Sequence, residues 1–598
     1  MTSSGLLKVI NVKPGINKND SPYQSEGTYV SCQWMRFQHD NPKKMGGWQT
    51  VPTSVTYEGI ARDSVSWVDL RGDRWFAVGT NSQLSIYNGQ LFTDITPVQT
   101  SVFATSVFST TLGSTVISAS VAGFNGVAGD FVAITSVNVD GIVLSGTYAI
   151  TSAGSNGSFN FNAATTASST ATNDGSTTLQ FLIPTGRKSA GAVGGWGSGP
   201  WGGTGSTGWG VGVTSVDVEL RTWVLDTWGE DLIANYRGGG IYLWGRTLGT
   251  GVRAAQISGA PTQANSIAVI NPPRILCVYG TSAYLGDFDP LLVRWSGNED
   301  YTQFNPAVTN ASGELRLQDG NEIIRAIISK QETVIFTDTG VYRQNYIGGD
   351  YVFSIEKAGS NCGLIGPQGA IDVNGVVYWM STAGFFLYNG AVQKLDCTVY
   401  DNIFNKTYGD GINFSQQFKV HCGVNTEFSE IIWFYPSRNS EENDRYVIYN
   451  YQDGLWYDGY LARTTWIDAS VYDRPIATGV SSTTFYHEVG TDADSDPIEA
   501  RLQTGQFDIE SGDNLFLVDQ YIPDYKNLSG DFNVRFTFKK YPDSSEEFVK
   551  GPFHMSNKNV LYFRGRGRTM QMSYSLSGVG SNIQIGKTRL RIKPDGLR

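Results

Sequence analysis

Apolar strands and polar turns alternate along most of the chain, and one unit of this pattern recurs. An apolar strand leads into a polar turn, and a short aromatic strand follows the turn. The turns are rich in Gly, Thr, Asn and Asp, which accept the backbone geometry of tight hairpins. The pattern therefore predicts a series of aromatic β-hairpins. Seven segments show it: RWFAVGTNSQLSIYNGQLFTDITP (74–97), DLIANYRGGGIYLW (231–244), ILCVYGTSAYLGDFDPLLVRWS (275–296), TVIFTDTGVYRQNY (333–346), VVYWMSTAGFFLYNG (376–390), RYVIYNYQDGLWYDG (445–459) and IATGVSSTTFYHEVG (476–490).

The spacing of these hairpins indicates the architecture. From residue 241 onward the aromatic strands recur about every 40 to 60 residues. Such a period is typical of a β-propeller, because a single blade buries too little apolar surface to be stable alone. The sequence predicts an all-β fold with a propeller of about six or seven blades. A sandwich or a long β-solenoid is the alternative that this repeat disfavours.

Residues 98–190 interrupt the repeat. Ser, Thr, Ala, Gly and Val dominate this segment, Trp is absent and charged residues are few. Apolar and polar residues alternate with a period of two in FVAITSVNV and GTYAITSAG. We expect a small inserted β-domain on a loop of the first blade, since loops tolerate insertions.

The segment GGWGSGPWGGTGSTGWG (194–210) follows the insertion and places three tryptophans on a run of glycines. It is predicted to be the tether by which the insertion rejoins the propeller. Trp196, Trp201 and Trp209 are candidate interface residues, because large aromatic surfaces gain by stacking on a neighbour. Packing within the chain, contact with a second subunit and disorder remain open for this segment.

The two ends of the chain differ from the middle and are predicted to form a β-rich platform. The N-terminal segment is extended in character, and the C-terminal region contains strands such as NVRFTFKKY. The expected order is an N-terminal arm or platform segment (1–60), the first blade (61–97), the inserted β-domain (98–190), the tether (191–214), the remaining blades (215–500) and a C-terminal β platform with a basic end (501–598).

Composition agrees with an all-β protein and narrows the function classes. Aromatic residues make up 13% of the chain, charged residues 17%, and Gly occurs 70 times. The net charge of −11 disfavours a general nucleic-acid binder. No apolar run is long enough for a transmembrane helix, and the N-terminus lacks the apolar region of a signal peptide. The five cysteines are far apart and odd in number, which predicts buried free thiols in a reducing cytoplasm.

The C-terminal stretch is the strongest electrostatic feature. Residues 561–598 hold eight basic residues and one acidic residue. In KTRLRIK, strand alternation places the basic side chains on one face. This face is compatible with solvent exposure, a partner subunit or a DNA backbone. The candidate interface residues of this stretch are Arg564, Arg566, Arg568, Lys587, Arg589, Arg591 and Lys593.

Motifs for catalysis and for cofactor binding are missing or incomplete. The sequence contains no HExxH, GxSxG or Walker motif, and its one GxGxxG string opens no expected helix. The run Asp492, Asp494, Asp496 lacks the Gly and Glu of a calcium loop, so it predicts an acidic turn, with a loose cation site as the alternative. Asp287 and Asp289 belong to a predicted turn. We therefore expect no catalytic residue, no cofactor and no resident metal.

Several stretches together resemble the nozzle proteins of short-tailed bacteriophages, also called tail tubular protein B or tail hub proteins. They are VINVKPGINKNDSPYQSEGTYVSCQWMRFQHDNPKKMGGWQ near the start, the tether GGWGSGPWGG, SGNEDYTQFNP (296–306) and RGRGRTMQMSYS near the end. The resemblance covers most of the chain, and the insertion resembles the family least.

The resemblance implies a structural virion protein of the phage tail, made in the host cytoplasm. It implies a homo-hexamer that binds the portal adaptor (the head-to-tail connector), passes genomic DNA during ejection, and docks tail fibres or spikes. It brings no catalytic residues. Two alternatives from other classes are a propeller-type polysaccharide-active enzyme, which would need two carboxylates at hydrolytic separation, and a glycan- or receptor-binding tail module.

Overall fold

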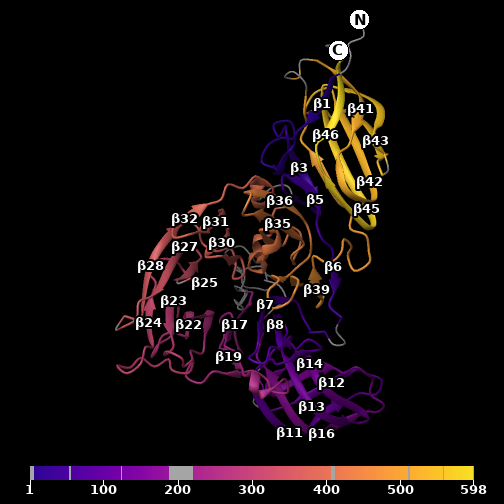
Figure 1. Ribbon diagram of the computed structural model, residues 1–598. Helices are drawn as coiled ribbons and strands as arrows, with labels where there is room; N and C mark the ends of the chain where they lie inside the picture. The colour runs from indigo at the N-terminus through magenta and orange to yellow at the C-terminus, as the bar shows by residue number, and fades with distance from the viewer. Residues whose placement is uncertain are drawn as a thin grey trace, which may run out of the picture. The chain divides into compact units, whose positions relative to one another are not determined.

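The regular secondary structure of the chain is almost entirely β-strand (Figure 1). The computed structural model describes residues 6–596 except 53–55, 123, 125, 187–219, 331, 350, 406–410, 509–511, 513 and 557. The chain divides into two compact units. The first comprises 1–52, 339–342 and 357–598, and the second comprises 53–338 and 343–356.

Small antiparallel sheets of four strands follow one another along the chain and form the propeller blades. The blades that begin in the second unit are β7 (Ala61–Val68), β8 (Arg74–Thr80), β9 (Leu84–Tyr87), β10 (Phe92–Asp94); β17 (Trp223–Trp228), β18 (Asp231–Tyr236), β19 (Ile241–Trp244), β20 (Ala255–Gln256); β21 (Ala264–Ile270), β22 (Ile275–Ser282), β23 (Phe288–Trp295), β24 (Gly313–Arg316); and β25 (Ile323–Ser329), β26 (Glu332–Thr337), β27 (Gly340–Tyr346), β28 (Phe353–Ser360).

The first unit contains the three remaining blades. They are β29 (Ala370–Val373), β30 (Val376–Ser381), β31 (Gly384–Tyr388), β32 (Val392–Lys394); β33 (His421–Asn425), β34 (Glu430–Tyr435), β35 (Arg445–Asn450), β36 (Leu455–Tyr460); and β37 (Thr465–Ile467), β38 (Ile476–Thr478), β39 (Thr484–His487), β6 (Trp48–Thr50). The short helix α1 (Tyr400–Phe404) lies between β32 and β33. The last blade is completed by β6, which pairs with β39, so the N-terminal segment supplies a propeller strand.

The first strands of successive blades contact one another within each unit. In the second unit β7 contacts β17 and β21 contacts β25, and in the first unit β33 contacts β37. A glycine makes room for a tryptophan at two of these contacts. A Cβ on Gly79 would lie 2.3 Å from the ring of Trp223, and one on Gly423 would lie 2.5 Å from the ring of Trp466. In both cases the indole N–H donates to the carbonyl of the residue after the glycine. Neighbouring blades are therefore locked by shape and by a hydrogen bond.

The insertion is a closed barrel with its own core. Its strands, in spatial order, are β11 (Val98–Thr110), β12 (Val116–Ser120), β15 (Ser158–Asn162), β14 (Ile142–Ala153), β13 (Phe131–Val139) and β16 (Ala171–Leu182). Alternate side chains of these strands point inward, and the buried rings of Phe108, Phe159, Phe161 and Phe181 fill the interior. Closure by β11 and β16 leaves the sheet without an unpaired edge.

The platform in the first unit consists of two sheets that share one core. The smaller sheet has the order β1 (Leu6–Ile10), β46 (Thr588–Pro594), β41 (Phe516–Ile522), β44 (Leu561–Gly567). The larger has the order β2 (Lys13–Ile16), β3 (Thr28–Gln33), β40 (Ala500–Thr504), β45 (Thr569–Ile585), β42 (Tyr525–Lys539), β43 (Glu547–His554), with β4 (Met35–Gln38) and β5 (Asn41–Lys44) attached through β45. Ring centroids of Tyr521 and Phe536, from the two sheets, are 5.3 Å apart.

These sheets confirm the predicted fold class: an all-β protein with a β-propeller, an inserted small β-domain and a β-rich platform built from both terminal segments. The blade-like sheets number seven in the part of the chain that the structure describes. In the same described part, no helix is both long enough and apolar enough to cross a membrane.

Candidate functional site

The outer face of the smaller platform sheet carries most of the basic residues found in the sequence. Along β46, Leu590 and Ile592 are buried, and Arg589, Arg591 and Lys593 alternate with them on the opposite side. Lys587 precedes the strand and is exposed. A strand with a period of two, with one face on the core, explains this arrangement. These side chains share a face, which we call the basic face.

Strand β44, which β41 separates from β46, contains only part of the RGRGR run. Arg564 and Arg566 are exposed on the basic face, because they alternate with a buried glycine. Arg568 lies beyond the end of the strand, where its Nη1 donates to the carbonyl of Gly512 at 2.5 Å. Its guanidinium carbon lies 5.8 Å from the ring centroid of Tyr541. The structure therefore separates Arg568 from the other arginines of this run.

Two aspartates neutralise part of the basic face. Arg591 and Lys593 each contact the Asp519 carboxylate at 2.6 Å, and Arg566 contacts Asp595 at 2.6 Å. Partial burial by itself would raise the pKa of Asp519, but the hydrogen bonds from Lys593 and Arg591 outweigh this effect and lower the pKa. The basic side chains still outnumber the acidic ones on this face.

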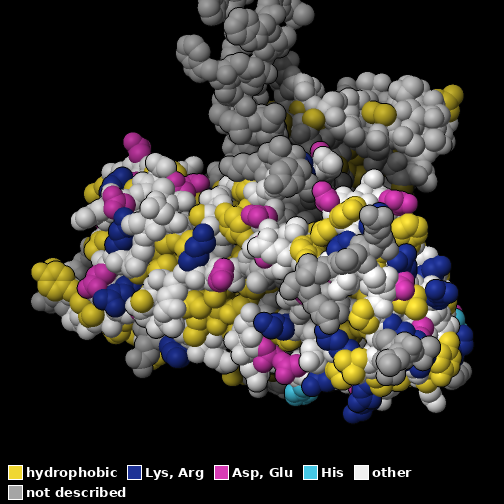
Figure 2. Space-filling model, turned by 90° about the horizontal axis from the view of Figure 1, so that it is seen from above, with side chains coloured by type: hydrophobic (Ala, Val, Ile, Leu, Met, Phe, Trp, Pro, Cys, Tyr) yellow, Lys and Arg dark blue, Asp and Glu magenta, His cyan; other side chains and the backbone are white. Residues whose placement is uncertain are grey.

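Apolar side chains are interspersed with these charges. Leu7 pairs with Arg591 and Val9 pairs with Arg589 across the β1–β46 ladder, so each pair shares a face. Leu7 is 45% exposed and Tyr562 on β44 is 69% exposed. Figure 2 shows one face of the molecule, on which basic, acidic and apolar side chains are mixed. Exposed apolar groups beside oriented charges are typical of protein–protein contacts.

The remaining sequence candidates do not join the basic face. Trp196, Trp201 and Trp209 lie outside the described residues. Among the acidic candidates, Asp494 accepts a hydrogen bond from Thr50 Oγ1 at 2.6 Å and Asp492 accepts from Gly580 N at 2.9 Å, so both brace loops. Asp289 pairs with Arg316 at 2.6 Å. In the described part of the chain, no group of three or more His, Cys, Asp or Glu side chains is arranged to hold a metal ion.

All five cysteines are buried free thiols, as predicted. Burial raises the pKa of Cys277 to about 12 and that of Cys362 to about 11. A thiol with such a pKa stays protonated at neutral pH and is a poor nucleophile.

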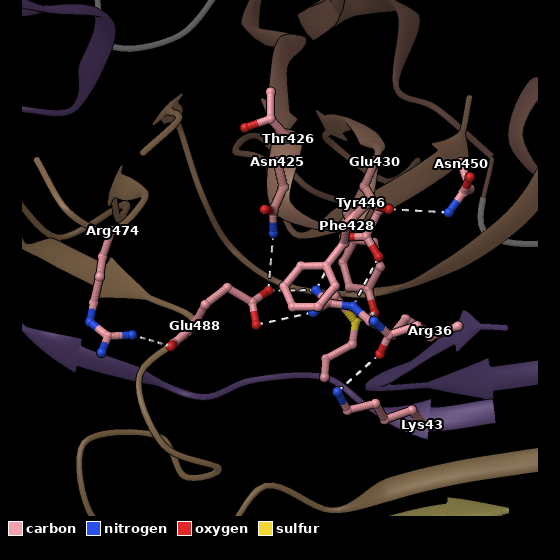
Figure 3. A network of polar contacts seen from close by, with 12 residues as sticks. Arg36, Lys43, Asn425, Thr426, Phe428, Glu430, Tyr446, Asn450, Arg474 and Glu488 are labelled. Atoms are coloured by element: carbon pink, nitrogen blue, oxygen red, sulfur yellow. Dashed lines mark hydrogen bonds and ion pairs between the residues drawn. The ribbon is translucent and has the colours of Figure 1, made fainter. Parts of the chain in front are cut away.

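A buried ion cluster joins the N-terminal hairpin to the blades of the first unit, and sequence reasoning missed it. Arg36 on β4 donates from Nε to Glu430 Oε1 at 2.9 Å and from Nη2 to Glu430 Oε2 at 3.1 Å. Its Nη1 donates to Glu488 Oε2 at 3.1 Å. The side chains of Arg36 and Glu430 are 2% and 1% exposed. One guanidinium therefore holds two carboxylates that come from different blades (Figure 3).

Neighbouring groups fix the geometry of this cluster. The ring centroid of Phe428 lies 3.5 Å from the guanidinium carbon of Arg36. Asn425 Nδ2 donates to Glu488 Oε1 at 3.1 Å, and the Tyr457 hydroxyl donates to Glu430. Burial raises the pKa of Glu430, the charge of Arg36 opposes this shift and the charge of Glu488 adds to it. Because its donors are committed to partners within the fold, we interpret the cluster as a structural clamp.

A second buried cation lies beside the strand that completes the last blade. Arg463 Nε donates to His487 Nε2 at 2.9 Å, and its guanidinium carbon lies 4.0 Å from the ring centroid of Phe485 and 5.0 Å from that of Trp48. Trp48 and His487 are also paired in the β6–β39 ladder. Strand β6 is thus held by the contact of Trp48 with Arg463 as well as by its backbone pairing with β39.

This environment predicts an acid-labile blade. Burial, followed by the charge of Arg463, holds the pKa of His487 well below 6.5. The unfolded chain binds a proton below about pH 6.5 that the folded chain resists, so stability is lost as pH falls, by up to about 1.4 kcal/mol per pH unit. We expect His487→Gln, which keeps an acceptor for Arg463, to flatten this dependence in urea titrations between pH 7 and 5. The exposed His39→Gln is the control, and equal slopes for wild type and His487→Gln would refute the assignment.

The comparisons with known proteins do not assign a family. No protein-family model and no curated protein matches the sequence. Among solved structures, the computationally designed Ika8 protein aligns with 73% of this chain and 99% of its own, at 9% identity and a TM-score of 0.31. The phage phi92 endosialidase aligns with 63% of this chain and 64% of its own, at 11% identity and a TM-score of 0.20. BamB from Moraxella catarrhalis aligns with 46% of this chain and 84% of its own, at 9% identity and a TM-score of 0.25. The strand topology of the chain itself is that of a β-propeller protein with an inserted barrel and a β-rich platform.

Proposed function

We propose that the protein is a structural subunit of the tail nozzle of a short-tailed bacteriophage, and that it acts by assembly without a catalytic step. In this proposal six copies form a ring that binds the portal adaptor, docks fibres or spikes and lets genomic DNA pass. The sequence resemblance supports the identity of the assembly. A net charge of −11 suits a conduit, since like charge keeps the phosphate backbone from adhering to its wall.

The observation that carries the proposal is the basic face of the platform. Exposed Leu7 and Tyr562 supply apolar area, and Arg589 and Arg564 supply charge that orients an acidic partner. The clamp around Arg36 ties the platform strands to the propeller blades within the first unit. A subunit whose platform is tied to its blades loses little conformational entropy when its basic face binds a partner, and this favours assembly into a ring.

Assembly is the direct test of the proposal. Purified protein mixed with portal adaptor rings should give sixfold particles in electron micrographs. The double variant Arg564→Glu/Arg589→Glu should weaken this assembly about tenfold or more, because the reversed charges repel an acidic partner. Lys8→Glu serves as the control. Lys8 lies on β1, which pairs with β46, and it alternates with Leu7 and Val9, so its side chain is not on the basic face. Protein that stays monomeric in the presence of adaptor rings would contradict the proposal.

A further inference from the structure

A groove of about 390 Å³ lies on the outer face of the larger platform sheet. Its central strand, β45, contributes the small side chains of Ser573 and Ser575 to the groove, since Met572 and Tyr574 point into the core. Longer side chains on the flanking strands rise on both sides. The groove therefore forms because the short serine side chains of β45 lie between longer polar side chains on β40 and β42.

The strand register aligns the lining residues in two rows. In one row, Gln503 on β40 is opposite Ser573, which is opposite Arg535 on β42. In the second, Arg501 is opposite Ser575, which is opposite Asn533. Neighbouring strands are about 4.8 Å apart, so each row spans about 10 Å. The lining thus presents hydroxyl, amide and guanidinium groups at the spacing of a small ring-shaped ligand.

One cation in the groove is uncompensated. Arg501 donates to both oxygens of Glu499, at 3.0 and 2.8 Å, so this pair is neutral. Arg535 is exposed, and within the described residues no hydrogen bond or ion pair engages its side chain. A guanidinium in this state offers a fork of donors to an oxyanion.

The groove is unsuited to an extended peptide that pairs through its backbone. Strands β40, β45 and β42 are each paired on both sides, so no edge is free for strand addition. Recognition must therefore use side chains, and those available are mostly hydroxyls and amides. With one free cation, the groove also lacks the row of charges that a nucleic-acid backbone requires.

We propose that this groove binds an acidic saccharide, with Arg535 holding its carboxylate or sulfate and with Ser573, Ser575, Asn533 and Gln503 bonding to its hydroxyls. The volume is at the lower end of the range for small-molecule sites, which fits one or two sugar rings. The proposal is independent of the nozzle assignment, because it concerns the larger sheet and not the basic face of the smaller one.

Calorimetric titration of the full-length protein tests the proposal. The probes are tetragalacturonate, which carries carboxylates, a κ-carrageenan tetrasaccharide, which carries sulfates and no carboxylates, and the methyl ester of tetragalacturonate, which has the same rings without charge. At least one acidic probe should bind, and the ester should bind about tenfold more weakly or not at all, because charge-assisted hydrogen bonds are the stronger ones. The two acidic arms distinguish a carboxylate ligand from a sulfate ligand.

Two substitutions should shift the affinity in opposite directions. Arg535→Gln should lower it about tenfold. Glu499→Gln should raise it several-fold, since it removes a repelling carboxylate and releases Arg501. Lys526→Gln, on β42 outside the groove, is the matched control and should have no effect. The proposal is overturned if neither acidic probe binds, if Arg535→Gln leaves binding unchanged, or if a single-stranded oligothymidylate binds more tightly than both saccharides.

Discussion

Replacing Arg36 with methionine is expected to destabilise the protein by about 3–5 kcal/mol, because it leaves a buried carboxylate without its counter-ion. The side chain of Glu430 is 1% exposed, and its nearest cation is Arg36. Glu488 loses the same partner. The loss is measured as a lower urea midpoint of the full-length protein, followed by tryptophan fluorescence, since Trp433 and Trp456 lie in the same core.

The sign of the pH dependence distinguishes an uncompensated charge from a simple packing defect. Burial already raises the pKa of Glu430 in the presence of Arg36, and removal of the cation raises it further. A folded-state pKa above the unfolded one means that stability increases as pH falls through that range. Arg36→Met should therefore be less destabilising at pH 5 than at pH 8, and Glu430→Gln should rescue part of the loss. The exposed Arg501→Met should cost less than about 1 kcal/mol. A pH-independent defect in Arg36→Met would contradict the assignment.

The hairpins can be predicted from the sequence because their signal is local. The segment 445–459 contains β35 and all of β36 except its last residue, and the turn between them includes Gly454 at a φ of +70°. The segment 376–390 contains β30 and β31, which pair as a hairpin. Each prediction needs only the apolar alternation and a turn residue within about fifteen positions.

The position of β6 in the last blade and the clamp around Arg36 could not be predicted in the same way. β6 pairs with β39, more than four hundred positions later in the chain. Arg36 and Glu430 are 394 positions apart. The available signal was weak: Arg36 stands between Met35 and Phe37, and Glu430 opens the run EIIWFY. A charge inside an apolar strand indicates a buried partner, but the sequence does not say which residue that partner is.

The basic stretch shows where alternation stops being informative. It places Arg589, Arg591 and Lys593 on one face because β46 continues through all three. The same rule groups Arg564, Arg566 and Arg568, yet β44 ends at Gly567 and Arg568 turns away. The groove at Arg535 was missed for a related reason. It depends on the register between β40, β45 and β42, which are joined by long connections.

Truncating Trp223 to alanine should destabilise the second unit by about 3–5 kcal/mol, the range for a fully buried large aromatic side chain. Trp223 has no exposed surface, and its indole N–H donates to the Thr80 carbonyl at 2.7 Å. It also opens the first strand after the insertion, so it fixes where the chain re-enters the propeller. Thermal unfolding of the full-length variant measures the loss.

Gly79 supplies the paired experiment. A valine there would force its Cβ to within 2.3 Å of the Trp223 ring, so Gly79→Val alone should destabilise by about 1–3 kcal/mol or more through overpacking. In the double variant the valine occupies part of the space that the indole vacates. The double loss should therefore be smaller than the two single losses added together, by at least about 0.5 kcal/mol, as is found for residues in contact. The pair Gly423 and Trp466 in the first unit repeats this geometry and should show the same coupling. Additive losses in both pairs would mean that the blades are joined by their backbones and general apolar burial, and that the fit of tryptophan against glycine contributes nothing specific.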